Sequence, residues 1–279
     1  MPGLLRSIVR SYVRHSPIEK GKYHVVQAMR RIDPPKKVVS LVAGRYLMEL
    51  DLSEYLQGQL YYFGYFEKEL TRLIEASLQP GSVMVDAGAN IGTFSLLAAS
   101  LGATCHAFEA APDNCAALRR NMALNQFTSI EVHECALSDH SGEATFYLYE
   151  ETGERNMCGQ NALFKRGHGR EIREPTATLD SALSDLPRID FIKSDVEGAD
   201  FLVLRGARGI LDKFHPLVVV EAAEELASKL GGSVQDILKI LGEHGYRVSE
   251  LTRSGLVPID PSTRPIEFAT LVARFPRPS

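Results

Sequence analysis

The sequence of 279 residues lacks the features that mark membrane-spanning and exported proteins. No apolar run is long enough to cross a bilayer. Arg6, Arg10 and Arg14 interrupt the first apolar segment, so we expect no signal peptide. The four cysteines, which show no metal-ligand spacing, are Cys105, Cys115, Cys135 and Cys158. We therefore expect buried free thiols and a cytoplasmic location.

Signals for metal, nucleic-acid and dinucleotide binding are also missing. The eight histidines include no pair at the spacing of metal ligands. The formal net charge of −4 gives no general attraction to nucleic acid, and basic and aromatic residues do not alternate as they do in RNA-binding segments. A Gly-x-Gly-x-x-Gly motif is absent, which argues against a dehydrogenase. We expect no nucleic-acid partner.

Basic residues are concentrated at the start of the chain. The first 37 residues hold nine Lys or Arg and two acidic residues. Apolar residues recur there at helical spacing, with the arginines on another face. The apolar residues are Leu4, Leu5, Ile8, Val9, Tyr12 and Val13. We expect this amphipathic helix to dock on the protein's own body or on a second subunit of a homo-oligomer, with a membrane surface as the alternative.

A second helix is expected at 23–32, followed by a β-hairpin at 37–52. The hairpin alternates apolar and charged residues, which places Tyr46, Met48, Leu50 and Leu52 on one buried face. We treat residues 1–57 as an N-terminal segment of helices and hairpin. Residues 58–279 then form the main domain, with a first helix at 67–78.

From residue 83 onward, expected strands and helices alternate, which predicts an α/β fold with a parallel sheet and right-handed crossovers. Strands are expected at 83–86, 104–109, 130–137, 142–149, 189–193, 217–221, 246–251 and 268–275. Helices are expected at 92–101, 112–124, 178–186, 199–211 and 234–244. The polar segment 150–174 is expected to be a mobile loop and a candidate lid. Its His168 is expected to be an ordinary loop residue, with approach to the acceptor on closure of the lid as the alternative.

The segment 83–94 (VMVDAGANIGTF) carries the most specific signal. A strand, a turn of small residues and a helix let backbone N–H groups approach a nucleoside cofactor. Asp86 stands two residues before Gly88, at the mouth of the expected crevice. A carboxylate there would repel the pyrophosphate of a dinucleotide but attract the ammonium and sulfonium groups of S-adenosylmethionine (SAM). The segment therefore favours a methyl donor over NAD.

Further donor contacts are expected where the strands end. Glu109 follows Gly88 by 21 residues, the spacing of a carboxylate that meets ribose hydroxyls. Ala136 and Leu137 would enclose the adenine, and Ser138 or Asp139 would reach its amino edge. The expected donor contacts are Asp86, Gly88, Ala89, Asn90, Gly92, Glu109, Ala110, Ala136, Leu137, Ser138, Asp139 and Asp195.

Ionisable residues gather at the end of the expected fourth strand. A hydroxyl that accepts a methyl group must lose its proton, which a nearby carboxylate can take. Asp195 is the first candidate for this role, with Glu197 and Glu221 behind it. Lys193 would hold Asp195 ionised, orient the acceptor, or simply form an ion pair that fixes the strand end. Paired carboxylates also bind divalent metal, but no spacing here requires a metal, so we expect none.

Several segments together resemble the FkbM-type SAM-dependent methyltransferases. They are LYYFGYFE at 60–67, VDAGANIG at 85–92, FEAAP at 108–112, ALSD at 136–139, TLD at 178–180, IKSDVEG at 192–198, VLRG at 203–206 and VVE at 219–221. The resemblance covers about residues 58–222. It implies a class I (Rossmann-like) methyltransferase fold, with a seven-stranded, mostly parallel sheet whose last strand is antiparallel.

The same resemblance implies SAM as the donor, S-adenosylhomocysteine as the product, and a hydroxyl acceptor on a sugar or another small molecule. It places Glu67 near the amino-acid end of the donor. Two features depart from the family pattern: Ser194, where a bulky aliphatic residue is usual, and the segment 158–163, where small residues are usual. Both are expected on the acceptor side.

Two other functions stay open. The first is N-methyl transfer to an amine or to RNA, which the basic N-terminus allows. Against it, the chain has SDVE at 194–197 in place of the Asn- or Asp-Pro-Pro-aromatic segment that often holds a planar amino group. The second is a SAM-binding protein without catalysis, against which the carboxylates near the expected methyl position argue.

Overall fold

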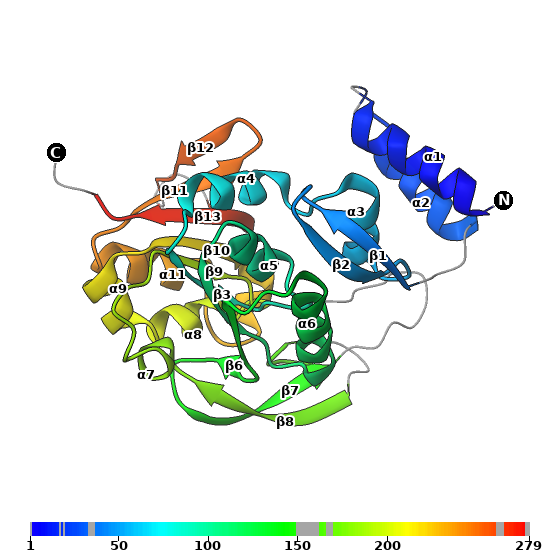
Figure 1. Cartoon of the computed structure of the whole chain (residues 1–279). Coiled ribbons are helices and arrows are strands. Elements are labelled where there is room, and N and C mark those ends of the chain that lie inside the picture. The colour runs from blue at the N-terminus through cyan, green and yellow to red at the C-terminus, as the bar shows by residue number, and fades with distance from the viewer. Residues whose placement is uncertain are drawn as a thin grey trace.

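The computed structural model describes residues 2–16, 18, 20–32, 37–148, 162–165, 170–260 and 265–276 (Figure 1). Its centre is an eight-stranded sheet in the order β12-β11-β13-β10-β9-β3-β4-β5. The strands are β3 (Val83–Ala87), β4 (Thr104–Phe108), β5 (Ile130–His133), β9 (Phe191–Ser194), β10 (Leu217–Ala223), β11 (Arg247–Thr252), β12 (Gly255–Pro258) and β13 (Phe268–Arg274). Adjacent strands from β5 to β10 pair in parallel, and β13 is antiparallel to β10. The class I methyltransferase sheet is thus confirmed, with β12 as an eighth strand.

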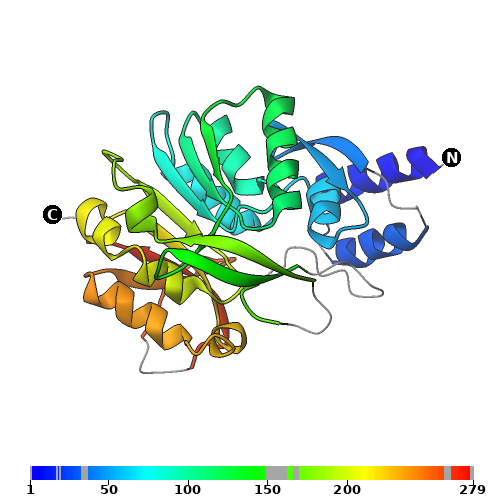
Figure 2. The same cartoon turned by 90° about the horizontal axis from the view of Figure 1, so that it is seen from below.

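Helices cover the two faces of this sheet in separate groups (Figure 2). One face packs against α4 (Lys68–Ser77), α5 (Thr93–Ser100) and α6 (Pro112–Asn125). The other packs against α7 (Leu179–Ala182), α8 (Asp200–Arg205), α9 (Arg208–Phe214) and α11 (Val234–Glu243), while α10 (Glu224–Ser228) follows β10. Alternate residues of one strand point to opposite faces, so Met84 enters the first core and Val85 the second.

A second, three-stranded sheet lies beside the carboxyl ends of the central strands. It consists of β6 (Ala136–Leu137), β8 (Arg170–Ala177) and β7 (Gly142–Leu148), in that order. β7 and β8 form a long antiparallel ribbon along one edge of the molecule (Figure 1). Phe146 and Leu148 of β7 pack on Ala136 and on Ala110 and Ala111, so the ribbon is anchored next to the end of β4.

The N-terminal hairpin of β1 (Lys37–Val42) and β2 (Tyr46–Asp51) packs on the main domain and shares its core. The buried face has the expected members: Tyr46, Met48, Leu50 and Leu52. Two helix residues fix its backbone, because Asn121 accepts from the N–H of Glu49 and Asn125 pairs with both backbone groups of Leu47. The Tyr46 hydroxyl donates to the Thr93 carbonyl at 2.8 Å.

The N-terminal helix α1 (Pro2–His15) packs with α2 (Lys22–Ile32) and α3 (Tyr55–Phe63) at one end of the molecule (Figure 1). Arg14 caps α3, because its guanidinium donates to the carbonyls of Tyr61 at 2.8 Å and Tyr62 at 3.4 Å. Val13 is buried, whereas Leu5, Ile8 and Tyr12 are exposed. The helix therefore docks on the protein's own body partly through its basic side, while the second subunit and the membrane surface stay predictions.

Several expected elements are wrong in their limits. The strand expected at 130–137 divides into β5 and β6, which belong to different sheets, at a tight turn where the Cys135 N–H donates to the His133 carbonyl. The helix expected at 199–211 divides into α8 and α9, because Asp180 accepts from the N–H groups of Gly209 and Ile210 and so begins a new helix. Residues 170–174 belong to strand β8, where a loop was expected. Helix α3 and strand β12 were not expected.

Other expectations concern parts that the structure describes only in part. Cys105 and Cys115 are buried free thiols, as expected, whereas Cys135 is free but only half-buried. Cys158, His168 and the middle of the candidate lid lie outside the described residues. No described helix is both long enough and apolar enough to cross a membrane.

Candidate active site at the carboxyl ends of the strands

A pocket of about 400 Å³ opens where β3, β4, β9 and β10 end. Parallel α/β sheets bind ligands at this edge, and the volume lies within the range of small-molecule sites. Its wall includes the Gly88–Ala89–Asn90 turn after β3, Glu109 and Ala110 after β4, and Lys193, Asp195 and Glu197 around the end of β9. Glu67, Glu221, Ala136 and Leu137 also line it. Most of the expected site residues are therefore brought together.

The turn after β3 depends on Gly88, which has a φ of +76°. A Cβ at this position would collide with the backbone carbonyl of Asp195, since the turns after β3 and β9 touch here. The N–H groups of Gly88 and Ala89 both donate to the Phe108 carbonyl at 3.0 Å. Three strand ends are thus held together by backbone contacts, and the site has a fixed frame.

Gly92 has a different role from the one expected. A Cβ there would collide with the Leu118 side chain, so the glycine permits α5 and α6 to pack closely. Gly92 is not among the described residues that line the pocket, and neither are Ser138 and Asp139. Ser138 is buried with its N–H on the Ala177 carbonyl, and Asp139 contacts His140. Their contact with a donor stays a prediction that this geometry does not favour.

Asp86 lies beneath the pocket floor. Its side chain is fully buried and accepts a hydrogen bond from the Ser95 hydroxyl at 2.6 Å. The other oxygen, Oδ1, accepts no hydrogen bond from any described residue but lies 3.5 Å from Lys193 Nζ. A carboxylate buried in this way acts on a pocket ligand through Lys193 and not by direct contact, which corrects the expectation that Asp86 stands at the mouth of the crevice.

Glu109 faces the pocket from the end of β4. Its oxygens accept from the N–H of Asn90 at 2.7 Å and of Ala111 at 2.9 Å, and Asn114 Nδ2 lies at 3.3 Å. Burial raises the pKa of Glu109, and these hydrogen bonds oppose that rise. Oε1 accepts from both Ala111 and Asn114, but Oε2 accepts only from Asn90. The second lone pair of Oε2 therefore remains able to accept a ligand hydroxyl.

Lys193 is the centre of an electrostatic cluster. Its ammonium, buried within the protein, lies 3.4 Å from Asp195 and 3.5 Å from Asp86, and donates to the Gly88 carbonyl at 3.1 Å. Burial alone would favour the neutral amine, but Asp195, Asp86 and further acids raise the Lys193 pKa above its usual range. Lys193 is therefore a fixed cation that joins the ends of β3 and β9, which is the ion-pair role considered from the sequence.

Two other carboxyls of the cluster, Glu67 and Glu221, have raised pKa values. Burial and the charge of Asp195 raise the pKa of Glu67 from 4.5 to about 7. Burial, Asp195 and Glu197 raise the pKa of Glu221 above its usual range. With one fixed cation among several acids, the pocket favours a further positive charge from a ligand.

Sequence comparison places this site in a known family. A family model described as the methyltransferase FkbM domain matches residues 86–248, which is more than half of the chain. The 31-O-demethyl-FK506 methyltransferase FkbM of Streptomyces tacrolimicus is 30% identical over 200 residues, which cover 61% of this chain and 75% of that protein. The chain belongs to the FkbM methyltransferase family.

Other similar proteins match over parts of their length. Methyltransferase 1 of Beauveria bassiana is 30% identical over 171 residues, or 54% of this FkbM-family chain and 66% of that protein. The hexuronic acid methyltransferase AglP of Haloferax volcanii is 27% identical over 63% of this chain and 68% of that protein. A solved FkbM methyltransferase from Methylobacillus flagellatus is 18% identical with a TM-score of 0.44, over 80% of this chain and 55% of that chain. This chain thus spans slightly less than two thirds of the Beauveria protein.

Ser194, where the sequence departs from the FkbM pattern, does not face the acceptor side. It is buried, and its hydroxyl donates to Asp200 Oδ1 at 2.6 Å. Burial raises the pKa of Asp200 to about 7, and the Ser194 hydrogen bond opposes the rise. The second Asp200 oxygen has no hydrogen bond from the described residues. The expectation for Ser194 is wrong, because it supports the loop that carries Asp195 from below.

Much of the apolar wall of the pocket in this FkbM-family chain was not predicted from the sequence. Tyr55 and Leu56 of α3, and Phe66 beside Glu67, line the pocket from the N-terminal side. Phe146 of β7 and Phe268 of β13 line it from the other side. No local motif marks these residues, although Phe66 lies inside the 60–67 segment that carried the resemblance. Phe268 is 64% exposed and so lies at the rim of the pocket.

Proposed function

We propose that this chain transfers a methyl group from SAM to a hydroxyl of a small molecule or a sugar. The observation that carries the proposal is the charge of the pocket. Glu67, Asp195, Glu197 and Glu221 line one part of it, and Lys193 is the one basic residue among the described lining residues. A phosphate-free cofactor with positive charge suits such a site, whereas a dinucleotide would be repelled.

The other lining residues fit the rest of this donor. The Gly88 turn allows the backbone to approach a ligand closely, and Glu109 Oε2 offers its second lone pair to a ribose hydroxyl. Phe108, Ala136 and Leu137 give an apolar slot of the kind that encloses an adenine. When bound, SAM supplies a sulfonium methyl group that a nucleophile can take. Glu67 also lines the pocket, and we assign it to the donor's amino-acid end, as the family resemblance implies.

The hydroxyl acceptor is supported by the acids that remain beside the methyl position. A hydroxyl needs a base to take its proton, and Asp195, Glu197 and Glu221 all line the pocket. Asp195 is already held near Lys193, which positions it. Glu221, whose pKa burial and neighbouring acids raise, is the stronger proton acceptor once it is ionised. We assign proton removal to Asp195 with Glu221 as the neighbouring alternative.

The relatives' names agree with an oxygen acceptor without fixing its identity. The name of the Streptomyces tacrolimicus protein refers to a 31-O-demethyl substrate, and the name of the Haloferax volcanii protein refers to a hexuronic acid. Both substrate descriptions contain oxygen acceptors. N-methyl transfer to an amine or RNA, and SAM binding without catalysis, are the competing functions that the experiment must separate.

The test combines binding with transfer of a labelled methyl group. Calorimetric titration with SAM and S-adenosylhomocysteine is expected to show one site per chain, weakened by about 1–3 kcal/mol in Glu109→Ala. Labelled SAM is then supplied with parallel panels of hydroxylated metabolites, sugars, amines and RNA. Label on a hydroxylated acceptor supports the proposal. No heat at millimolar donor, or label confined to amines or RNA, would overturn it.

A further inference from the structure

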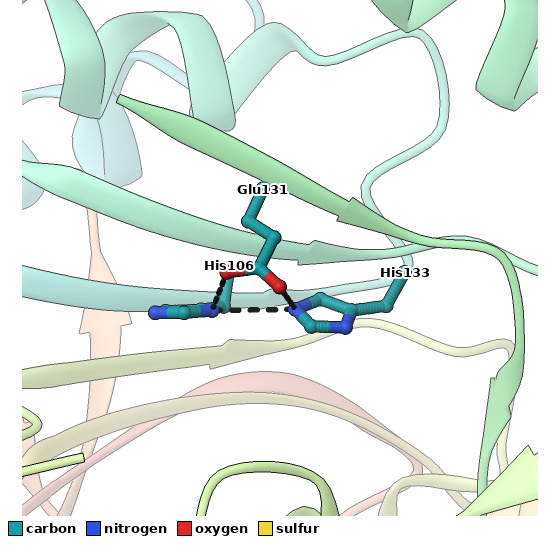
Figure 3. A group of neighbouring side chains, drawn as sticks. All are labelled: His106, Glu131 and His133. Atoms are coloured by element: carbon teal, nitrogen blue, oxygen red, sulfur yellow. Dashed lines mark hydrogen bonds and ion pairs between the residues drawn. The ribbon is translucent and has the colours of Figure 1, made fainter. Parts of the chain in front are cut away.

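Three side chains that bind metals well converge on the outer part of the central sheet. His106 lies on β4, and Glu131 and His133 lie on the neighbouring edge strand β5. In the parallel register His106 is opposite Glu131 and Phe108 is opposite His133. Since residues two apart on a strand share a face, the three side chains must meet on one side of the sheet. Figure 3 shows the Glu131 carboxylate reaching both imidazole rings.

The distances between their ligand atoms are short and similar. His106 Nδ1 lies 3.2 Å from His133 Nε2 and 3.4 Å from a Glu131 oxygen, and the other Glu131 oxygen lies 3.8 Å from His133 Nε2. In a tetrahedral site with bonds of about 2.1 Å, ligand atoms stand about 3.4 Å apart. The two Glu131 distances go to different oxygens, and one ligand atom from each residue lies within 4.8 Å of the other two. The two imidazole nitrogens and one Glu131 oxygen thus lie close to the spacing of such a site, and a small side-chain adjustment completes it.

A hydrogen bond between His106 Nδ1 and His133 Nε2 accounts for the contact of the two rings but not for the approach of Glu131. Two neutral imidazoles can share one proton between His106 Nδ1 and His133 Nε2, because two facing N–H groups would repel each other. That single proton would face an imidazole lone pair and the Glu131 carboxylate at once. Among the three side chains, lone pairs thus exceed protons at the point where they meet, and a cation relieves this excess.

We propose that His106 Nδ1, His133 Nε2 and the Glu131 carboxylate form a binding site for one zinc-type divalent transition-metal ion, with solvent as the remaining ligand. Two imidazoles and a carboxylate suit transition metals better than Mg²⁺ or Ca²⁺, which prefer oxygen ligands alone. The access path is also present. The side chains of His106 and His133 are 7% and 20% exposed, whereas Glu131 is 64% exposed, so the site opens to solvent on the Glu131 side.

The site adjoins the active-site pocket without belonging to it. The His133 ring stacks on Phe108 with the ring centroids 4.3 Å apart, and Phe108 lines the pocket. The His133 carbonyl accepts the N–H of Glu109 at 3.1 Å. An ion here would join edge strand β5 to β4 behind the wall that carries Glu109. We therefore assign it a structural role, independent of whether methyl transfer occurs.

The test uses the full chain after treatment with a chelator, titrated with ZnCl₂ alone and with CoCl₂ alone. We expect one Zn²⁺ per chain, a rise in the melting temperature, and the visible absorption bands of four-coordinate Co²⁺. Glu131→Gln should weaken Zn²⁺ binding by more than about tenfold and remove the thermal shift. Because Glu131 is exposed, this variant should fold, which equal melting temperatures of the metal-free proteins would verify.

Glu134→Gln is the matched control, since Glu134 is an exposed acid just beyond β5 that pairs with Arg119 outside the cluster. It should bind Zn²⁺ like the unmodified chain. Equal Zn²⁺ affinity in the unmodified chain and Glu131→Gln would overturn the proposal, as would equal stabilisation by Mg²⁺ and Zn²⁺. Loss of SAM binding has no bearing on these readouts, so the two proposals fail separately.

Discussion

Gly88 and Asp195 touch through their backbones, although they lie 107 positions apart in the sequence. The Gly88 Cα faces the Asp195 carbonyl with no room for a side chain between them, and the Asp195 N–H donates to the Ala87 carbonyl at 3.1 Å. This contact sets the distance between the turn expected to hold the donor and the carboxylate expected to serve the acceptor. Any side chain at position 88 must separate the two.

Gly88→Ala should therefore lower both stability and donor binding. A left-handed φ costs a non-glycine residue about 1–2 kcal/mol, and the collision with a backbone oxygen adds to this. We expect a total loss of more than about 2 kcal/mol in the free energy of unfolding, together with loss of measurable SAM binding. Gly81→Ala is the control, because Gly81 has a φ of +83° with no atom near its Cβ position. Equal losses in both variants would show that the Asp195 contact is unimportant.

The sequence predicts the frame of the central sheet well because each strand has a local signature. The apolar run Val83–Val85 and the mostly β-branched run that begins at Leu217 are both continuous, as strands buried on two faces should be. The prediction from sequence fails where tertiary contacts determine the secondary structure. β8 alternates polar residues on a mostly solvated ribbon, so its composition resembles a loop. The break between α8 and α9 depends on Asp180, which is distant in sequence.

The site shows the same division. The spacing of Asp86, Glu109 and Asp195 locates the pocket, because strand ends in a parallel sheet meet at one edge. How deeply a side chain is buried below the pocket surface, however, cannot be predicted from local sequence. Asp86 and Ser194 are buried behind the residues that line the pocket, although both were expected to face a ligand. The His106, Glu131 and His133 cluster also escaped notice, since it unites two strands and has no local ligand spacing.

Lys193→Met should destabilise the protein strongly. Removing the ammonium leaves Asp86 and Asp195 without their buried partner, and breaking a buried ion pair from one side costs about 3–5 kcal/mol. Chemical denaturation at about pH 7.5 would measure this loss in the free energy of unfolding. Lys229→Met removes an exposed ion pair with Glu225 and should cost less than about 1 kcal/mol. The loss in Lys193→Met should shrink as the pH falls, because protonation of the acids removes their repulsion. A pH-independent loss would contradict this electrostatic origin.

The pH dependence of SAM binding should reflect Glu67. In the folded chain its pKa is raised from 4.5 to about 7 by burial and by Asp195, so the folded state keeps a proton that the unfolded chain has released. This group's contribution to stability therefore falls as the pH rises between these two values. A cationic ligand favours the ionised form, so binding should release a proton near pH 7 and tighten as the pH rises from about 6 to about 8.

Calorimetry in two buffers of different ionisation enthalpy measures that proton release directly. Glu67→Gln should abolish the part of the proton release that comes from Glu67. Glu225→Gln is the control, because it changes an acid whose side chain is 84% exposed, and it should leave the proton release unchanged. Proton uptake on binding in the unmodified chain would contradict the sign of this prediction.

Asp195→Asn and Glu221→Gln should distinguish the two candidate proton acceptors. Loss of a positioned base typically lowers turnover by about 10²–10⁴-fold. If Asp195 takes the proton, Asp195→Asn shows this loss with SAM affinity changed by less than about threefold, because Lys193 keeps Asp86 as a partner. Glu221→Gln then retains most of the turnover and shifts its pH profile, since Glu221 no longer repels Asp195. A large loss of turnover only in Glu221→Gln would show that Glu221 on β10 is the base. Unchanged turnover in both variants would show that neither Asp195 nor Glu221 is the base.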